Sequence, residues 1–336
     1  MKKAKFYKPL DQNKVQCFLC PHECTIADGK IGICGVRQNI KGTLYSLVYE
    51  RAIATHVDPI EKKPLFHVYP SSRSFSVATV GCNFRCMFCQ NHDIAQMPHR
   101  TGIAGQEMPV DAIVIQAEQQ NCKTIACTYT EPTIFYEYAY DIAKSASEKL
   151  IETVFISNGY ISPEPVKEIA PYLSAANVDL KGWDEKFYRK VIGGDLQNVL
   201  ETLKLLKKLN IWVEVTTLVV PGYVDNEESL RDIARFIKNE LGVETPWHIS
   251  RFHPQYKYMD HAPTSLDILQ RGREIGLEEG LRYVYSGNVP GDDGEHTKCY
   301  SCGAVLIRRF GFRVLDNRIK NGACPECGAK IDGIGM

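Results

Sequence analysis

Cysteine is the residue that most constrains this chain, because 13 of its 336 residues are cysteine and most of them fall in groups. Such a number is too low for a small disulfide-stabilised protein and high for an ordinary reduced enzyme. No secretory apolar segment follows the basic start of the chain, so we expect a cytoplasmic, reducing environment. The grouped cysteines therefore indicate metal binding. Two others, Cys122 and Cys127, stand alone and are expected to be buried thiols.

The C-terminal group consists of two Cys-x2-Cys pairs, Cys299 with Cys302 and Cys324 with Cys327. A glycine follows each pair, and glycine lets the backbone amides turn back toward sulfur. This spacing is typical of a structural four-cysteine zinc ribbon, with iron bound as in rubredoxin as the alternative. The predicted ribbon, residues 295–336, holds few large apolar side chains. We therefore expect its metal to supply much of its folding free energy.

The middle group has three cysteines, Cys82, Cys86 and Cys89, spaced Cys-x3-Cys-x2-Cys. A tetrahedral zinc site needs a fourth ligand, which His92 could supply. A [4Fe-4S] cluster, in contrast, needs only three cysteines when one of its irons is to stay open. Three thiolates leave its fourth iron open to bind a small molecule and to pass an electron to it. The spacing favours the cluster.

With Phe88 included, the same loop resembles the C-x3-C-aromatic-C signature of the radical S-adenosylmethionine (SAM) superfamily. The resemblance implies that Cys82, Cys86 and Cys89 hold a catalytic [4Fe-4S] cluster, that its open iron chelates SAM, and that Phe88 packs on adenine. The chain is similar to the branch that contains the pyruvate formate-lyase activating enzyme. Over nearly its whole length it resembles the radical SAM component of the AmmeMemoRadiSam system, in segments such as CFLCPHEC, GCNFRCMFCQNHDIAQ, TYTEPTIFYEY, NVDLKGW and WHISRFHP.

The rest of the chain alternates β-rich segments with segments of helical apolar spacing, which predicts a parallel sheet with right-handed crossovers. Together with the resemblance, this alternation predicts an α/β fold. Its centre is a partial (β/α)6 TIM-like barrel at residues 73–290. An N-terminal cysteine-containing extension, residues 1–72, precedes the barrel, and the zinc ribbon follows it. The predicted strands are 75–80, 124–129, 153–158, 175–180, 212–220, 247–250 and 282–287. The predicted helices are 110–119, 134–147, 165–173, 196–209, 230–241 and 265–276.

Polar residues follow the second predicted strand, at the end where a barrel enzyme carries its site. Taken alone, they are also typical of helix caps and turns. By the resemblance, Thr130 and Glu131 stand where the superfamily's Gly-Gly-Glu segment contacts the amino group of SAM. Tyr129 and Thr130 replace the two glycines, so we expect a backbone that approaches the ligand less freely.

The ends of the third and fourth predicted strands carry the other residues that the resemblance places at SAM, namely Asn158, Asp179 and Lys181. The lysine ammonium would neutralise the methionine carboxylate of SAM, and Asp179 would hold Lys181.

The N-terminal group, Cys17, Cys20, Cys24 and Cys34, is spaced Cys-x2-Cys-x3-Cys-x9-Cys. Four thiolates could hold a structural zinc ion or an auxiliary iron–sulfur cluster, and free or redox-paired thiols are a further alternative. The spacing leaves these three interpretations open.

Charge limits the classes of function, because 40 basic and 40 acidic side chains balance. This balance argues against general nucleic-acid binding, and no apolar run is long enough to cross a membrane. We expect an oxidoreductase that uses an external one-electron donor to cleave SAM reductively. The product would be a carbon radical, 5′-deoxyadenosyl, that abstracts hydrogen from a protein glycine, as glycyl-radical-enzyme activases do, or from a small molecule. The alternative is a zinc-ribbon scaffold or nucleic-acid-binding protein with a degenerate barrel.

Overall fold

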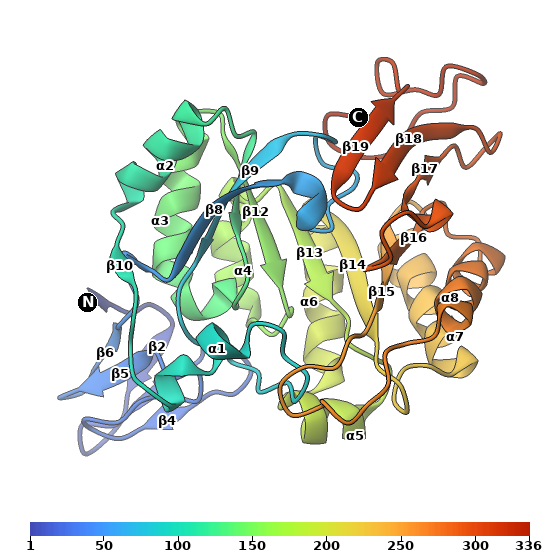
Figure 1. Ribbon diagram of the computed structural model, residues 1–336. Helices are drawn as coiled ribbons and strands as arrows, with labels where there is room; N and C mark the ends of the chain where they lie inside the picture. Colours follow the sequence, from blue (N-terminus) through green and yellow to red (C-terminus); the bar gives the residue numbers. More distant parts are fainter.

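An eight-stranded sheet forms the centre of the computed structural model, which describes residues 1–336 (Figure 1). All its strands are parallel except β8, which pairs antiparallel with β9. β8 and β16 are its two edges, so the sheet stays open. In sheet order the strands are β16 (Val284–Gly287), β15 (Trp247–Arg251), β14 (Trp212–Val219), β13 (Ala175–Asp179), β12 (Glu152–Ser157), β11 (Thr124–Cys127), β9 (Arg73–Ala78) and β8 (Ala54–Pro59).

Every predicted strand is confirmed, with ends that move by two residues at most. Two further observations refine the prediction. β8 falls inside the predicted N-terminal extension, residues 1–72, yet it belongs to the central sheet. The strands are buried on both faces, as parallel strands usually are. On one face Ala126, Val154 and Ala175 pack against Ile60 and Leu65 from the segment between β8 and β9.

The helices that cross between parallel strands are also confirmed in number and position. Side-chain caps fix where three of them begin: Asp195, Asn226 and Ser265 each accept a hydrogen bond from a backbone amide in the first turn. The helices are α2 (Val110–Gln119), α3 (Tyr136–Ser147), α4 (Pro163–Ile169), α6 (Leu196–Lys208), α7 (Glu227–Phe236) and α8 (Leu266–Glu278).

Short helical turns extend or connect these elements. Those that continue a long helix are η3 (Pro132–Phe135), η4 (Ala170–Tyr172) and η6 (Ile237–Leu241). The others are η1 (Ile60–Lys62), α1 (His92–Ala95), η2 (Met97–His99), α5 (Glu185–Phe187), η5 (Tyr188–Ile192) and η7 (Asp293–Glu295). α1, η2, α5 and η5 border the carboxyl ends of the parallel strands, where the arrows of β12 and β13 point in Figure 1.

The N-terminal segment lies at that same end of the sheet, beside α1 (Figure 1). It forms two small antiparallel sheets. One contains β1 (Lys2–Lys3), β6 (Thr43–Ser46) and β5 (Arg37–Ile40), and the other β2 (Tyr7–Pro9), β3 (Val15–Cys17) and β4 (Thr25–Ile26). A further two-stranded pair joins β7 (Arg51–Ala52) to β10 (Gln106–Glu107).

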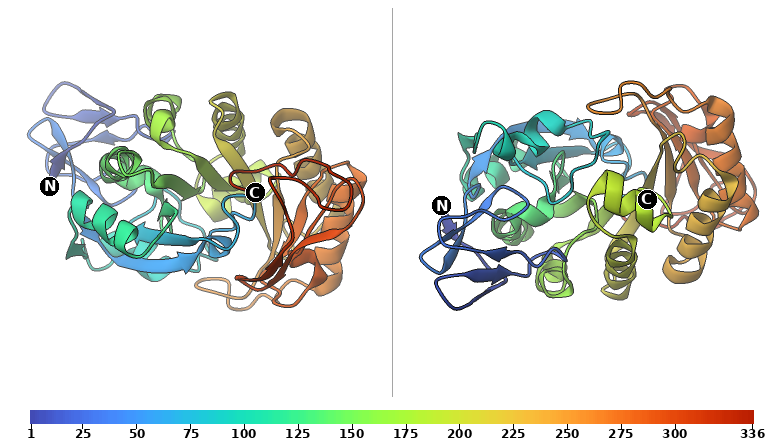
Figure 2. Two further views of the ribbon diagram at one scale, coloured as in Figure 1. Left: turned by 90° about the horizontal axis from the view of Figure 1, so that it is seen from above. Right: turned by 90° about the horizontal axis from the view of Figure 1, so that it is seen from below.

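The C-terminal segment forms a three-stranded antiparallel sheet at the opposite end, where the parallel strands begin (Figure 1). Its strands are β17 (Thr297–Lys298), β18 (Val305–Phe310) and β19 (Arg313–Asn317). Its small core includes Leu306 and Ile307 and is completed by Phe66, Tyr283 and Tyr285 from the rest of the chain. In both views of Figure 2 the N-terminal segment (blue) and this C-terminal segment (red) lie on opposite sides of the molecule.

None of the helices combines the length and the apolar composition that crossing a membrane requires.

Candidate functional site

The candidate site lies at the carboxyl ends of four neighbouring parallel strands, β9, β11, β12 and β13. Because these strands are parallel and adjacent, the loops that follow them meet at the carboxyl end of the sheet. The predicted residues on these loops are Cys82, Cys86, Phe88 and Cys89 after β9, Thr130 and Glu131 after β11, Asn158 after β12, and Asp179 and Lys181 at the end of β13.

The cysteine loop after β9 is held by its backbone. The amides of Arg85 and Met87 donate to carbonyls of η5 at 2.8 and 3.1 Å, and the amide of Phe84 donates to the Cys82 sulfur at 3.4 Å. Burial raises the pKa of the Cys86 thiol to about 12. A bound metal is what would keep such a thiol deprotonated at neutral pH.

The three loop sulfurs do not all lie within 4.8 Å of one another, so they are spread more widely than the ligands of a single ion. His92 does not complete a tetrahedral zinc site with them, and its ring stacks on Tyr256 with the centroids 4.4 Å apart. In a [4Fe-4S] cluster each thiolate binds a different iron, which separates the sulfurs. The donors present therefore fit a cluster better than a zinc ion.

Glu131 is a buried carboxylate whose hydrogen bonds all run within the protein. One oxygen accepts from the Thr133 amide and hydroxyl and from the Ser157 hydroxyl, at 3.0, 2.6 and 2.8 Å. The other accepts from the Asn158 amide at 2.7 Å. Burial raises the pKa of Glu131. The carboxylate therefore ties the end of β12 to the loop after β11. Next to it, Thr130 donates its hydroxyl to the Thr79 carbonyl at 2.8 Å.

Tyr129 gives that loop an unusual backbone conformation. Its φ of 63° lies in the left-handed region that glycine adopts easily, so the backbone takes a glycine-like course although glycine is absent. The Tyr129 hydroxyl donates to the Asp58 carboxylate on β8, which also accepts from Lys63 at 2.7 Å. These partners hold the pKa of Asp58 below its usual value, although burial alone would raise it. This buried anchor compensates for the backbone strain.

Asn158 connects the end of β12 to the cysteine loop. Its side-chain amide donates to the Cys82 sulfur at 3.8 Å and to the Asn83 side-chain oxygen at 2.8 Å. Asn83 in turn donates to the Tyr160 carbonyl at 2.7 Å. Sequence reasoning missed Asn83 and Tyr160, because neither stands out until the loops are folded together.

Asp179 and Lys181 form an ion pair with 2.8 Å between the carboxylate and the ammonium. Burial lowers the pKa of Lys181, but attraction to Asp179 and to the nearby Cys86 sulfur outweighs it, so the pKa is raised. The Tyr188 hydroxyl accepts from the Lys181 amide at 2.9 Å and fixes the backbone there. The lysine is therefore a permanent cation beside the cysteine loop.

Phe88 lies in an aromatic group that the sequence did not reveal. Its ring stacks on Phe187 with an angle of 9° and a centroid distance of 6.1 Å. Phe252 and Tyr258 meet it edge-on at 6.3 and 5.9 Å. Only 3% of Phe88 is exposed. These rings come from α5 and from the loops after β9 and β15, and together they form an apolar group around Phe88.

The C-terminal cysteines come together as one group, with all four sulfurs within 4.8 Å of one another. The Cys299 and Cys327 sulfurs are 3.6 Å apart, and those of Cys302 and Cys324 are 3.7 Å apart. A tetrahedral zinc ion with Zn–S bonds of about 2.3 Å separates its sulfurs by about 3.8 Å. These residues therefore fit a single zinc ion.

The N-terminal cysteines line one pocket but do not form such a compact group. Burial raises the pKa of Cys20, of Cys24 and, to about 12, of Cys34. His22 lies among them, but its Nε2 is 2.8 Å from the Asn83 carbonyl, a bond that joins this segment to the cysteine loop.

Comparison with known proteins agrees with this arrangement. The family model described as the radical SAM superfamily matches residues 76–237. An uncharacterized protein of Methanocaldococcus jannaschii is 48% identical over 334 residues, which cover 99% of each chain. The pyruvate formate-lyase-activating enzyme of Clostridium pasteurianum is 23% identical over 60% of this chain and 87% of its own.

Among solved structures, a radical SAM methyltransferase from Sphaerobacter thermophilus has a similar fold. Its TM-score is 0.51 at 12% identity, over 68% of this chain and 71% of that one. The family model covers most of the parallel strands and the three-cysteine loop, and a named relative is an activating enzyme of pyruvate formate-lyase: this chain belongs to the radical SAM superfamily.

Proposed function

We propose that this protein reductively cleaves SAM and uses the resulting 5′-deoxyadenosyl radical to abstract a hydrogen atom from a substrate. Cys82, Cys86 and Cys89 would hold the [4Fe-4S] cluster. When bound, the cluster would supply one electron to the sulfonium of SAM from its open iron, after an external one-electron donor has reduced it.

The observation that supports this proposal most strongly is the linkage of three strand ends around one cysteine. Asn158 reaches the Cys82 sulfur at 3.8 Å, and Glu131 holds the Asn158 backbone at 2.7 Å. These residues are far apart in the sequence, and a merely structural cysteine loop would not need buried polar contacts from two further strands. Their arrangement suits a site that must hold a ligand in one orientation.

Lys181 and Asp179 are the charged residues of this site that would lie near SAM. The side chain of Lys181 is 14% exposed and that of Asp179 is 35% exposed, so both remain reachable by a ligand. In our proposal the ammonium binds the methionine carboxylate of SAM while Asp179 keeps the lysine in place. The buried Glu131 acts differently: it positions the Asn158 loop and leaves the ligand to neighbouring groups.

The aromatic group around Phe88 would keep water away from the cysteines. Phe187, Phe252 and Tyr258 surround its ring, and an apolar wall of this kind protects a reactive radical from side reactions. Phe88 would also offer its ring edge to the adenine of SAM.

The hydrogen donor would be a glycine residue of a partner protein or a small molecule. The relative from Clostridium pasteurianum is named as an activating enzyme of pyruvate formate-lyase, which supports the first choice for this branch.

The test is anaerobic reconstitution with iron and sulfide, followed by dithionite and SAM, with chromatographic detection of 5′-deoxyadenosine. We expect product from the native chain and none from Cys86→Ala, because two thiolates cannot hold the cluster with one open iron. Cys122→Ala is the matched control, since this buried thiol lies outside all three cysteine groups and should leave product formation unchanged. Intact SAM in the presence of a fully reconstituted, reduced native cluster would contradict the proposal.

We also propose that the C-terminal segment, residues 295–336, is a separate zinc ribbon with a structural role. Its sulfur–sulfur distances of 3.6 and 3.7 Å support a single tetrahedral ion. All four protein ligands are present, so no position is left open for substrate.

A further inference from the structure

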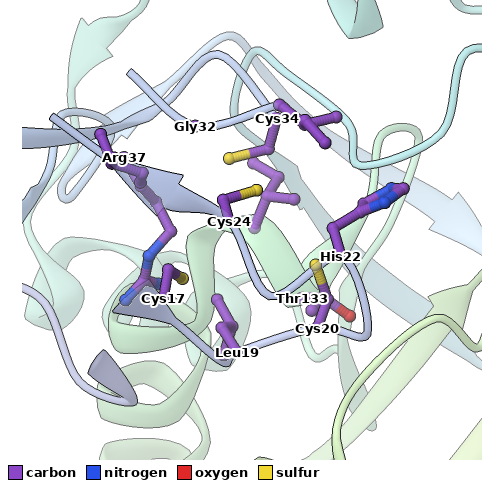
Figure 3. A pocket seen from close by; sticks show the side chains of 12 residues that line it. Cys17, Leu19, Cys20, His22, Cys24, Gly32, Cys34, Arg37 and Thr133 are labelled. Atoms are coloured by element: carbon purple, nitrogen blue, oxygen red, sulfur yellow. The ribbon is translucent and has the colours of Figure 1, made fainter. Parts of the chain in front are cut away.

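The N-terminal cysteines surround a pocket of their own, apart from the three-cysteine loop (Figure 3). Cys17, Cys20, Cys24 and Cys34 all line it. Apolar side chains form much of the remaining wall, from Leu19, Ile26 and Ile33 of the N-terminal segment and from Ile134 of η3. Four thiols around one hollow are an unusual way to build an apolar core.

The spacing of these sulfurs separates this pocket from the zinc ribbon. No three of them lie mutually within 4.8 Å, whereas all four C-terminal sulfurs do. A single tetrahedral zinc ion holds its sulfurs about 3.8 Å apart and would leave no hollow between them. The sulfurs of the three-cysteine loop also do not all lie within 4.8 Å of one another. In a [4Fe-4S] cluster each thiolate binds its own iron, so the sulfurs lie farther apart than around a single zinc ion. The N-terminal sulfurs resemble the three-cysteine loop in this respect and differ from the ribbon.

A buried arginine independently indicates a ligand in the pocket. Arg37 lines the pocket and is 2% exposed, and its Nε atom has no hydrogen-bond partner. Its terminal nitrogens bind Glu137 at 3.1 and 3.3 Å and the Lys5 carbonyl, so only the Nε side is free. A buried unpaired N–H is costly. A cluster with four thiolate ligands carries a net negative charge, which would satisfy it.

His22 also lines the pocket. Its Nε2 lies 2.8 Å from the Asn83 carbonyl, an arrangement that leaves Nδ1 as a further candidate donor. A [4Fe-4S] cluster takes four protein ligands, one for each iron, and four thiols are present. The cysteines are therefore sufficient as the donor set without the histidine.

We propose that Cys17, Cys20, Cys24 and Cys34 bind a second [4Fe-4S] cluster, in which cysteine ligates every iron. This inference goes beyond the proposed SAM cleavage and does not depend on it. The pocket directly adjoins the catalytic loop: a side chain at Gly81 would come within 2.9 Å of the Cys34 carbonyl.

The decisive experiment uses the full chain with Cys82, Cys86 and Cys89 all replaced by alanine, purified and reconstituted without oxygen. We expect about four iron atoms and four sulfides per chain, together with about one zinc from the ribbon. We also expect the reduced cluster to give an electron paramagnetic resonance spectrum that SAM leaves unchanged, because no iron is open. About two zinc atoms and no iron, no metal at the pocket, or a spectrum shifted by SAM would each overturn the proposal.

A second measurement keeps the test valid if the triple variant does not fold. In the otherwise native chain, Cys20→Ser with Cys24→Ser should lose about half of the iron, from about eight atoms per chain to about four. Cys122→Ser is the control and should retain all of it. Equal iron content in the double variant and the control would contradict a second cluster. Metal content is measured without SAM turnover, so this outcome is distinct from a failure of the proposed function.

Discussion

The two four-cysteine groups at the ends of this chain differ in nearly everything except their number of cysteines. The C-terminal sulfurs all lie within 4.8 Å of one another, whereas the N-terminal sulfurs surround a pocket. The C-terminal group exposes Cys302 and Cys327 at the surface, but no N-terminal cysteine is fully exposed. The same ligand type in the same number therefore occurs here in two different spacings and surroundings.

Their positions differ as well. The C-terminal ribbon covers the end of the sheet where the parallel strands begin, far from the candidate site (Figure 1). The N-terminal pocket lies at the other end and is joined to the cysteine loop after β9 through His22 and Asn83. Changes in the first group should therefore affect stability alone, and changes in the second should reach the site.

The largest effect should follow from removing ligands of the ribbon by Cys302→Ser with Cys327→Ser. Structural zinc contributes an apparent binding free energy of about 10–16 kcal/mol in zinc-finger peptides, so we expect loss of the zinc and unfolding of residues 295–336. Zinc analysis and hydrogen exchange would measure both. SAM cleavage should persist, because the ribbon lies at the opposite end. A variant that keeps one zinc per chain would show that the ribbon cysteines are not its ligands.

The next effect concerns two buried arginines, one in each region. Arg37 pairs with Glu137 at 3.1 Å with both side chains 2% exposed. Arg309 lies 3.9 Å from the Glu61 carboxylate with both side chains 0% exposed, and it donates to Thr297 at 2.7 Å and to the Phe66 carbonyl at 3.1 Å. Breaking a buried pair costs about 3–5 kcal/mol, because one charge remains unpaired. We expect both Arg37→Met and Arg309→Met to lower the unfolding free energy, and Arg37→Met alone to lower the iron content.

A double variant separates charge from packing in this prediction. Arg37→Met with Glu137→Met removes both charges and should recover part of the lost stability, while the iron content stays low. If Arg309→Met reduced the iron as strongly as Arg37→Met, the two regions would not be independent.

A smaller effect should appear with pH at the ribbon junction. His67 Nδ1 lies 2.6 Å from the Asp332 carbonyl, which only accepts, and Nε2 lies 2.6 Å from the Tyr285 hydroxyl, so the ring is neutral with Nδ1 donating. Burial lowers the pKa of His67 from 6.5 to about 4. Below pH 6.5 the histidine therefore binds a proton in the unfolded chain but not in the folded chain. The free energy of unfolding falls as the pH drops toward 4.

This single histidine should cost about 2 kcal/mol of unfolding free energy between pH 7 and pH 5. Urea titrations of the native chain and of His67→Gln at both pH values would measure it, and the native chain should lose more than the variant. Equal losses would show that His67 is not the titrating group. Iron content should stay the same in both chains, since His67 is remote from the N-terminal pocket.

The smallest effect compares glycines that share one conformation. Gly35 and Gly303 each follow a cysteine and have a φ of 77°. A side chain at Gly303 would meet nothing within 4 Å, but one at Gly35 would come within 2.6 Å of the Pro98 side chain. We expect Gly303→Ala to cost about 1 kcal/mol from backbone strain alone, and Gly35→Ala to cost more. Thermal unfolding would measure both; equal losses would contradict the tight packing at Gly35.

Local patterns in the sequence were enough to find the helices and strands of the central fold. The predicted helix 110–119 is α2 (Val110–Gln119), and the predicted strands 175–180 and 247–250 agree with β13 and β15 to within one residue. Apolar periodicity and capping residues act over a few positions, so no distant contact is needed to read them. The membership of β8 in the central sheet depends on long-range pairing, and the sequence placed that strand outside it.

The candidate site could be located from the sequence, but not its supporting contacts. Cysteine spacing identified the loop after β9, and the order of strands predicted that Asn158 and Lys181 would lie at the same edge. The partners that hold them were not visible. Asn83 carries no signal except its place beside Cys82, and the rings around Phe88 come from loops that meet only in the folded chain.

Three cysteine groups, an alternating α/β chain and an iron–sulfur type of loop could all be read from the sequence, because spacing and periodicity are local properties. The nature of the N-terminal group stayed open, since one set of four thiols suits either a zinc ion or a cluster. Folding alone shows that the four C-terminal sulfurs lie close together while the N-terminal ones do not, and that Arg37 lines the pocket without a partner at Nε. Distances between ligands depend on how separate segments pack, and no local pattern encodes them.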